Sequence, residues 1–102
     1  MPDVFTALAN PTRRSILTEL RHRPQSVNEL AAHFAIGRPS VSEHLQVLAA
    51  VGLVRDERAG QQRIYHLEAG PLADAADWLE PFEQYWKGRL RDLRAVLDEE
   101  HR

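Results

Sequence analysis

The stretch GRPSVSEHLQVLAAVGLV, residues 37–54, begins with a polar run that contains proline, continues as an amphipathic helix and ends at a glycine. Pro39 suits the first turn of a helix, and Gly52 suits the left-handed conformation just after a helix end. The apolar positions follow the helical i, i+4, i+7 spacing of a stripe packed on a core, and they are Val41, Leu45 and Leu48. The polar positions around the rest of the helix are Arg38, Ser40, Ser42, Glu43, His44 and Gln46.

A second, shorter helix is predicted directly before this stretch, over SVNELAAHF at residues 26–34. Ser26 and Glu29 have the spacing of a capping box, in which each side chain accepts a hydrogen bond from the other residue's backbone N–H. The link AIG, residues 35–37, joins the two helices. Two short helices joined by a short turn that contains glycine form a helix-turn-helix.

Two more helices are predicted upstream. Within NPTRRSILTELRHRP, residues 10–24, Asn10 suits the N-cap, Pro11 the first helical position and Pro24 the stop. A short first helix is indicated by Val4, Phe5 and Leu8. The helix-turn-helix is therefore expected to pack on helices that precede it in the chain.

The stretch LVRDERAGQQRIYHL, residues 53–67, follows the helix-turn-helix. A polar tip around Gly60 separates two runs, and the alternation of Arg63, Tyr65 and Leu67 in the second run is typical of a strand. These features predict a β-hairpin. A hairpin directly after the second helix of a helix-turn-helix is a wing.

The predicted fold is mainly α-helical with a small β-hairpin: a winged helix-turn-helix with about five helices and a two-stranded wing. A chain of 102 residues suits one domain, residues 1–102, in which residues 70–102 form a C-terminal helical dimerisation segment. Pro81 interrupts this segment, because its ring crowds the carbonyl one turn back and it has no N–H to donate. A kink or a break into two helices is expected there.

Apolar residues in the C-terminal segment recur with a spacing close to a heptad repeat. One short helix cannot bury such a seam on its own domain, so we expect a second copy to cover it with two-fold symmetry. The predicted interface residues are Phe5, Leu8, Leu79, Phe82, Trp86, Leu90, Leu93 and Leu97. Trp78, Phe82, Tyr85 and Trp86 concentrate four aromatic side chains in nine residues. Core and dimer packing is the preferred interpretation of them, and a hydrophobic pocket for an unknown small-molecule effector is the alternative.

The composition excludes several classes of function. The chain contains no cysteine, which excludes disulfides, thiolate metal sites and thiol redox sensors. It has no apolar run long enough to cross a bilayer and no signal peptide, so a cytoplasmic location without membrane contact is expected. The net charge is −2, but residues 1–67 carry 8 Lys plus Arg against 6 Asp plus Glu, and residues 68–102 carry 5 against 9. The winged part is therefore locally basic, which permits contact with DNA.

An enzymatic function is not expected. The chain has no G-x-S-x-G motif, no glycine-rich phosphate loop and no pair of histidines spaced i, i+4. Its five scattered histidines are read as surface or packing groups, so neither a cofactor nor a metal site is predicted.

Three stretches in this order and spacing, LANPTRRSIL, GRPSVSEHLQVLAAVGLV and GQQRIYHL, resemble the ArsR-type winged helix-turn-helix repressors over nearly the whole chain. The tail WLEPFEQYWKGRLRDL is similar to that of a subgroup without metal sites. The resemblance implies a homodimeric bacterial repressor. Its recognition helix and wing would bind a palindromic operator in double-stranded DNA, and its first and last helices would form the dimer interface.

The chain departs from the family pattern at two places. Metal-sensing members carry Cys-x-Cys after Glu-Leu in the helix before the recognition helix, whereas Ala31 and His33 stand here. The C-terminal helix has a single histidine, His101, where other members need paired histidines and carboxylates. The wing has Gln61 and Gln62 where many relatives have arginine at the tip, so the affinity of the wing for DNA would be weaker or depend more on hydrogen bonds.

The polar face of the recognition helix is interpreted as the DNA-reading surface, because such a helix fits the major groove. Arg38 suits guanine and Gln46 suits adenine, whereas Glu43 suits cytosine or only rejects phosphates. Ser40 and Ser42 suit bases or phosphates, and His44 suits packing or a phosphate rather than a base. In the wing, Arg55, Arg58 and Arg63 are candidates for phosphate or minor-groove contact, against surface ion pairing with Asp56 and Glu57. At the start of the second helix, Arg13 is a candidate for phosphate contact, against a structural role.

A rival hypothesis is a winged-helix module that binds a protein partner through the same surface, without specific DNA binding. The acidic residues Glu43, Asp56 and Glu57 near the proposed DNA face favour it. Only the repressor hypothesis requires sequence-specific binding that falls steeply with salt.

Overall fold

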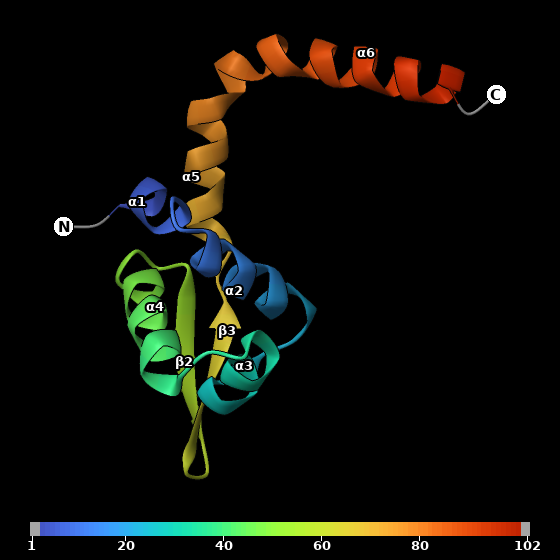
Figure 1. The fold of residues 1–102 in the computed structure, drawn as a ribbon. Coiled ribbons are helices and arrows are strands. Elements are labelled where there is room, and N and C mark those ends of the chain that lie inside the picture. The colour runs from blue at the N-terminus through green and yellow to red at the C-terminus, as the bar shows by residue number, and fades with distance from the viewer. Residues whose placement is uncertain (1–2, 101–102) are drawn as a thin grey trace.

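The helix and strand boundaries of the computed structural model (Figure 1) place a three-stranded sheet among the helices of a winged helix-turn-helix. The structure describes residues 3–100, without the side chains of residues 89–94 and 98–100. The elements are α1 (Val4–Leu8), α2 (Pro11–His22), β1 (Gln25–Ser26), α3 (Val27–Phe34), α4 (Arg38–Ala50), β2 (Val54–Ala59), β3 (Gln62–Leu67), α5 (Gly70–Leu79), the 3₁₀ turn η1 (Glu80–Phe82) and α6 (Glu83–Glu100). The predicted fold class is confirmed, with six α-helices among the described residues where about five were expected.

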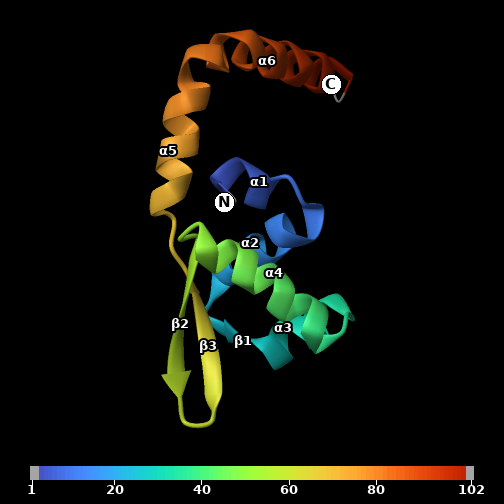
Figure 2. The ribbon, with the colours of Figure 1, turned by 90° about the vertical axis from the view of Figure 1, so that its left-hand side faces the viewer.

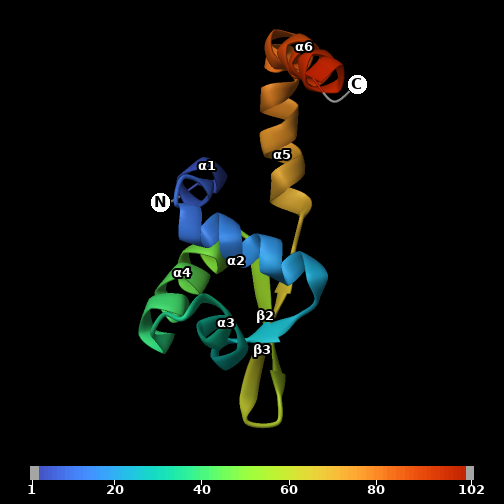
Figure 3. The same ribbon diagram turned by 45° about the vertical axis from the view of Figure 1, so that its right-hand side comes forward.

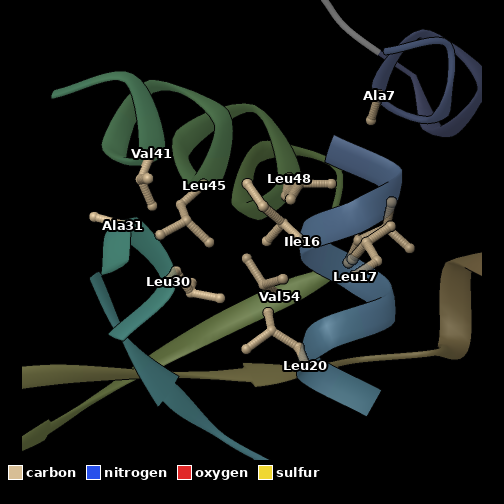
Figure 4. Close-up of a cluster of buried hydrophobic side chains, with 11 residues drawn as sticks. Ala7, Ile16, Leu17, Leu20, Leu30, Ala31, Val41, Leu45, Leu48 and Val54 are labelled. Atoms are coloured by element: carbon tan, nitrogen blue, oxygen red, sulfur yellow. The ribbon is translucent and has the colours of Figure 1, made fainter. Parts of the chain in front are cut away.

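The core lies where α2, α3, α4 and the wing meet (Figure 4). The side chains of Ile16, Leu30 and Leu45 point toward one another from three different helices, and all three are fully buried. Full burial of a side chain of this size contributes about 1.5–3 kcal/mol. The stripe predicted for the recognition helix, which is α4, faces this core.

The predicted helix caps are confirmed. The Asn10 side chain accepts a hydrogen bond from the backbone N–H of Arg13, and Pro11 is the first residue of α2. Ser26 and Glu29 form the capping box of α3. At the end of α4, Gly52 adopts the left-handed conformation with φ of 79°.

The wing differs from the prediction because its sheet has three strands, in the order β1-β3-β2. Gln25 and Ser26 of β1 pair antiparallel with Tyr65 and Ile64 of β3. A two-residue strand is too short to show alternation in the sequence, so only the approach of β3 makes it a strand. In all three ribbon views the β2–β3 hairpin projects beyond the helices (Figures 1, 2 and 3).

The C-terminal segment breaks at Pro81, one of the two outcomes expected there. The chain passes from α5 through η1 into α6, and α6 extends away from the rest of the fold (Figures 1 and 2). The molecule is therefore elongated, with dimensions of 54 × 33 × 20 Å. Within the described range, none of the helices is long and apolar enough to span a membrane.

Candidate nucleic-acid interface

The polar side of α4 lies at the surface, because the opposite side packs on the core. The exposed side chains among the predicted contact residues of α4 are Arg38, Ser40, Glu43 and Gln46, and the half-buried ones are Ser42 and His44. Pro39 occupies the second helical position, so the missing N–H costs no hydrogen bond. The start of α4 is thus an ordered, exposed helix end that carries a cation.

The strand register sorts the three wing arginines onto two faces of the hairpin. Arg58 lies directly opposite Arg63, and the same face carries Val54, which packs into the core. Arg55 is on the other face, since successive residues of a strand alternate between faces. Arg58 and Arg63 therefore share the core-facing side of the sheet, and Arg55 does not.

Two like charges directly opposite each other destabilise a hairpin unless an anion offsets them. One carboxylate is available on that face: Arg63 forms an ion pair of 2.6 Å with Asp56. Within the described part of the chain, Arg58 donates to the carbonyl oxygen of Gly60, at 3.4 Å. All of these side chains are exposed, so the ion pair is readily exchanged for another anion.

A hollow of about 280 Å³ joins the wing tip to the beginning of α3 and α4. Its lining residues are Ser26, Val27, Asn28, Arg38, Gln61, Gln62 and Arg63. The structure thus brings together Arg38 of the recognition helix and Arg63 of the wing, which are 25 positions apart in the sequence. Asn28 was not predicted to belong to this surface, and its position in the first turn of α3 carried no signal beyond its polarity.

Arg55 is engaged on the outer face of the wing. Its Nε donates to Glu68 at 2.5 Å, and its guanidinium lies 3.7 Å from Glu57. The Glu57 carboxylate also lies 3.1 Å from His66. This outer cluster resembles the surface ion pairing that the sequence left open as the alternative for the wing arginines.

Arg13 lies at the junction of α1, α2 and α4 rather than on the open surface. Its guanidinium donates to the carbonyl oxygens of Ala7 and Thr6, at 2.8 and 3.1 Å. It also lies 3.4 Å from Nδ1 of His44. The side chain is held by the protein itself, in keeping with the structural alternative.

The predicted dimer residues belong to α1, α5, η1 and α6, and most of those with described side chains are apolar groups at the molecular surface. The partly exposed ones are Phe5, Leu79, Phe82, Trp86 and Leu97, and Leu8 is half-buried against the core. Leu90 and Leu93 lie outside the described side chains. Trp78 is 59% exposed and contacts Phe5 and Phe82, with ring centroids 5.7 and 5.0 Å apart.

The comparisons with known proteins agree with this architecture. A family model described as a helix-turn-helix domain matches residues 8–57. The HTH-type transcriptional regulator Rv2034 of Mycobacterium tuberculosis is 40% identical, over 97% of this chain and 91% of that protein. The transcriptional repressor SdpR of Bacillus subtilis is 38% identical, over 80% of this chain and 91% of the repressor.

Solved structures identify the family. An ArsR-like transcriptional regulator from Rhodococcus sp. RHA1 superposes with a TM-score of 0.70 at 34% identity, over 91% of this chain and 88% of that chain. This chain belongs to the ArsR family of transcriptional regulators. A possible ArsR-family regulator from Mycobacterium bovis, Mb0332, solved as a homodimeric winged helix-turn-helix DNA-binding domain, has a TM-score of 0.65 at 27% identity. It covers 79% of this chain, and this chain covers 75% of it.

The cysteine positions of metal-sensing ArsR proteins are occupied differently here. Ala31 is buried in the core. Nε2 of the exposed His33 lies 3.2 Å from a carboxylate oxygen of Glu19 on α2. Across the described residues, no three histidine and carboxylate side chains gather closely enough to hold a metal ion.

Proposed function

We propose that this ArsR family regulator is a homodimeric repressor that binds a two-fold symmetric operator through α4 and the wing, and blocks a promoter that the operator overlaps. The observation that carries the proposal is the shared hollow of Arg38 and Arg63. A helix that enters the major groove and a hairpin that follows the phosphates need their cations on one surface. The locally basic charge of residues 1–67 supports contact with DNA.

Most of the predicted contact residues have a defined role in this proposal. Arg38 and Gln46 read guanine and adenine, Glu43 accepts from cytosine, and the two serines of the first turns bind bases or phosphates. Arg58 and Arg63 bind phosphates or reach into the minor groove. A DNA contact is less favourable for Arg55, because this residue faces away from the hollow and already pairs with two carboxylates.

The homodimer follows from the apolar surface of α1, α5, η1 and α6. Soluble monomers rarely expose this many large apolar side chains in one region. A second copy related by a two-fold axis would cover them and set the two α4 helices as a symmetric pair. The homodimeric relative from Mycobacterium bovis supports this assembly.

The regulator acts in the cytoplasm without a metal cofactor in this proposal. Ala31 offers no ligand atom, and His33 is one histidine beside one carboxylate. Repression would then be relieved by a change in protein level, by a small apolar effector or by a protein partner. Added zinc and chelators should leave operator affinity unchanged, and a stoichiometric metal that shifts it tenfold would overturn this part.

A fluorescence anisotropy titration tests the function. The probe is the DNA upstream of the regulator's own gene, with a scrambled duplex of equal length and composition as the control. We expect preference for the upstream DNA and a steep loss of affinity with added salt. Equal, weak binding to both duplexes would favour the rival hypothesis of a protein interaction module, which Asp56 and Glu57 on the wing would serve.

A further inference from the structure

The positive charge of Arg13 lies at the start of α2, where it is electrostatically unfavourable unless the side chain turns away. A cation in the first turn of a helix opposes the helix dipole. The side chain turns back to the C-terminal carbonyls of α1, the negative end of that short helix, where it donates to the oxygens of Thr6 and Ala7. Ala7 is fully buried, so this contact is part of the fold rather than a loose surface pair.

The same guanidinium reaches the recognition helix. One of its terminal nitrogens lies 3.4 Å from Nδ1 of His44, which is half-buried on α4. A guanidinium has only donors, so Nδ1 must be the acceptor. A neutral imidazole that accepts at Nδ1 carries its proton on Nε2. With this contact formed, His44 has its proton on Nε2, which leaves Nε2 as a hydrogen-bond donor.

We propose that Arg13 is a positioning residue for operator recognition, which holds His44 as an Nε2–H donor toward an acceptor of the DNA. This inference rests on the proposed function. It assigns His44 a hydrogen bond to the DNA, where the sequence left packing open as another role. It also assigns Arg13 an indirect role, where the sequence offered a phosphate contact as one choice.

The arrangement links the recognition helix to the apolar dimer surface. Arg13 holds the last carbonyls of α1, and Phe5 of α1 packs edge-on against Trp78 of α5. The donor on α4 is thus oriented by the same short helix that contacts α5. A shift of α1 on that surface would move the group that sets the His44 tautomer.

Nitrogen-15 NMR of the histidine rings tests the tautomer in the free protein. We expect His44 in the wild type to be protonated at Nε2, with Nδ1 in a hydrogen bond. The variant Arg13→Met should show a mixture of tautomers, and loss of the signal in His44→Gln assigns the resonance. Should Arg13→Met fail to fold by circular dichroism, Arg13→Lys takes its place, because a single ammonium nitrogen cannot span acceptors that the guanidinium reaches with three different nitrogens. A wild-type His44 protonated at Nδ1 would overturn the proposal.

A double-mutant cycle on operator affinity tests the role in recognition. Arg13→Met should weaken operator binding by up to about fivefold, the scale of one lost hydrogen bond, because His44 loses the contact that fixes its tautomer and its ring orientation. In the His44→Gln background the same change should have no effect, because a glutamine amide presents a donor without tautomer selection. Equal losses in both backgrounds would mean that Arg13 does not act through His44, which would overturn the proposal.

The salt dependence separates this role from a phosphate contact. Arg13→Met should leave the slope of log affinity against log salt unchanged, whereas loss of a phosphate contact lowers its magnitude by about 1. A lowered slope, with equal weakening on scrambled DNA, would overturn the proposal. If the wild type itself showed no preference for the operator, the proposed function would be wrong. The NMR measurement would still determine the tautomer of His44 in that case.

Discussion

At the scale of single residues, the DNA-facing surface combines side chains that read bases with side chains that only bind charge. Arg38 lies in the first turn of α4, and Arg63 lies on β3, in a hairpin that projects beyond the helices (Figure 3). The two arginines share one hollow but differ in what they can contact in a duplex. Substitution should therefore separate them by specificity and by salt dependence.

Arg38→Ala should lower operator affinity by about 1–3 kcal/mol and relax base preference, because a bidentate base contact carries sequence information. Arg63→Ala should instead weaken operator and scrambled DNA alike and reduce the salt slope by about 1. Anisotropy titrations at several salt concentrations measure both effects. Unchanged binding in both variants, with the fold intact, would reject this interface.

Asp56 restrains Arg63 through the 2.6 Å ion pair on the core-facing side of the wing. Asp56→Asn should raise the affinity for any duplex a few-fold, since it removes a carboxylate and releases Arg63. Glu68→Gln is the matched control, because it removes a carboxylate that pairs with Arg55 on the outer face. Gains of similar size in both variants would show that only net charge matters.

At the scale of elements, α3 depends on its capping box to hold the turn before α4. Ser26 and Glu29 satisfy two backbone N–H groups at the start of this eight-residue helix. Ser26→Ala should lower the free energy of unfolding by about 1 kcal/mol. Urea unfolding measures the loss, and Ser40→Ala on the exposed face of α4 serves as a control that should change it little.

The same box makes part of the stability dependent on pH. The side-chain hydrogen bond from Arg23, at 2.6 Å, and then the backbone N–H of Ser26 hold the pKa of Glu29 below its ordinary 4.5. A carboxyl with a lowered folded pKa stabilises the protein fully above its unfolded pKa and loses that contribution as the pH falls through the folded one. Urea unfolding from about pH 6 to pH 3 should therefore show a steeper acid loss in the wild type than in Glu29→Gln. Parallel curves of unfolding free energy against pH for the two proteins would contradict this prediction.

At the scale of the whole molecule, α5 and α6 form an arm (Figures 1 and 2). Apolar side chains of this arm are exposed at its surface. Phe82 stands at the bend and is 42% exposed. Phe82→Glu should produce monomers that lose the full operator, because a charge in an apolar interface loses solvation without gaining a partner. Sedimentation measures the assembly, with Glu83→Gln as a control that leaves the dimer intact.

The dimer also predicts the form of the operator. Two recognition helices that enter successive major grooves on one face of B-DNA lie roughly 34 Å apart. Footprinting should therefore reveal an inverted repeat with half-sites about 10 bp apart, centre to centre. A wild-type monomer at micromolar concentration, or protection of a single half-site, would end the dimeric mechanism while leaving the winged fold in place.

The sequence by itself determined the local structure. Helix ends are marked by Asn10 with Pro11, by Ser26 with Glu29, and by Gly52. Each of these residues acts on backbone groups within a few positions, so the sequence alone is enough to recognise it. The buried stripe of α4 follows from helical periodicity alone. These local features were enough to predict the helix-turn-helix, the position of the wing and the break at Pro81 as one of two outcomes.

Only the tertiary structure decided which distant groups meet. The strand β1 exists because β3 comes beside two residues that have no strand pattern of their own. The register of the hairpin, set by pairing across the sheet, separates Arg63 from Arg55. In the sequence, Arg13 is a cation at the unfavourable start of a helix, and only the folded structure places it against the end of α1 and the ring of His44. Contacts between residues far apart in sequence depend on how the elements pack, and no local pattern records them.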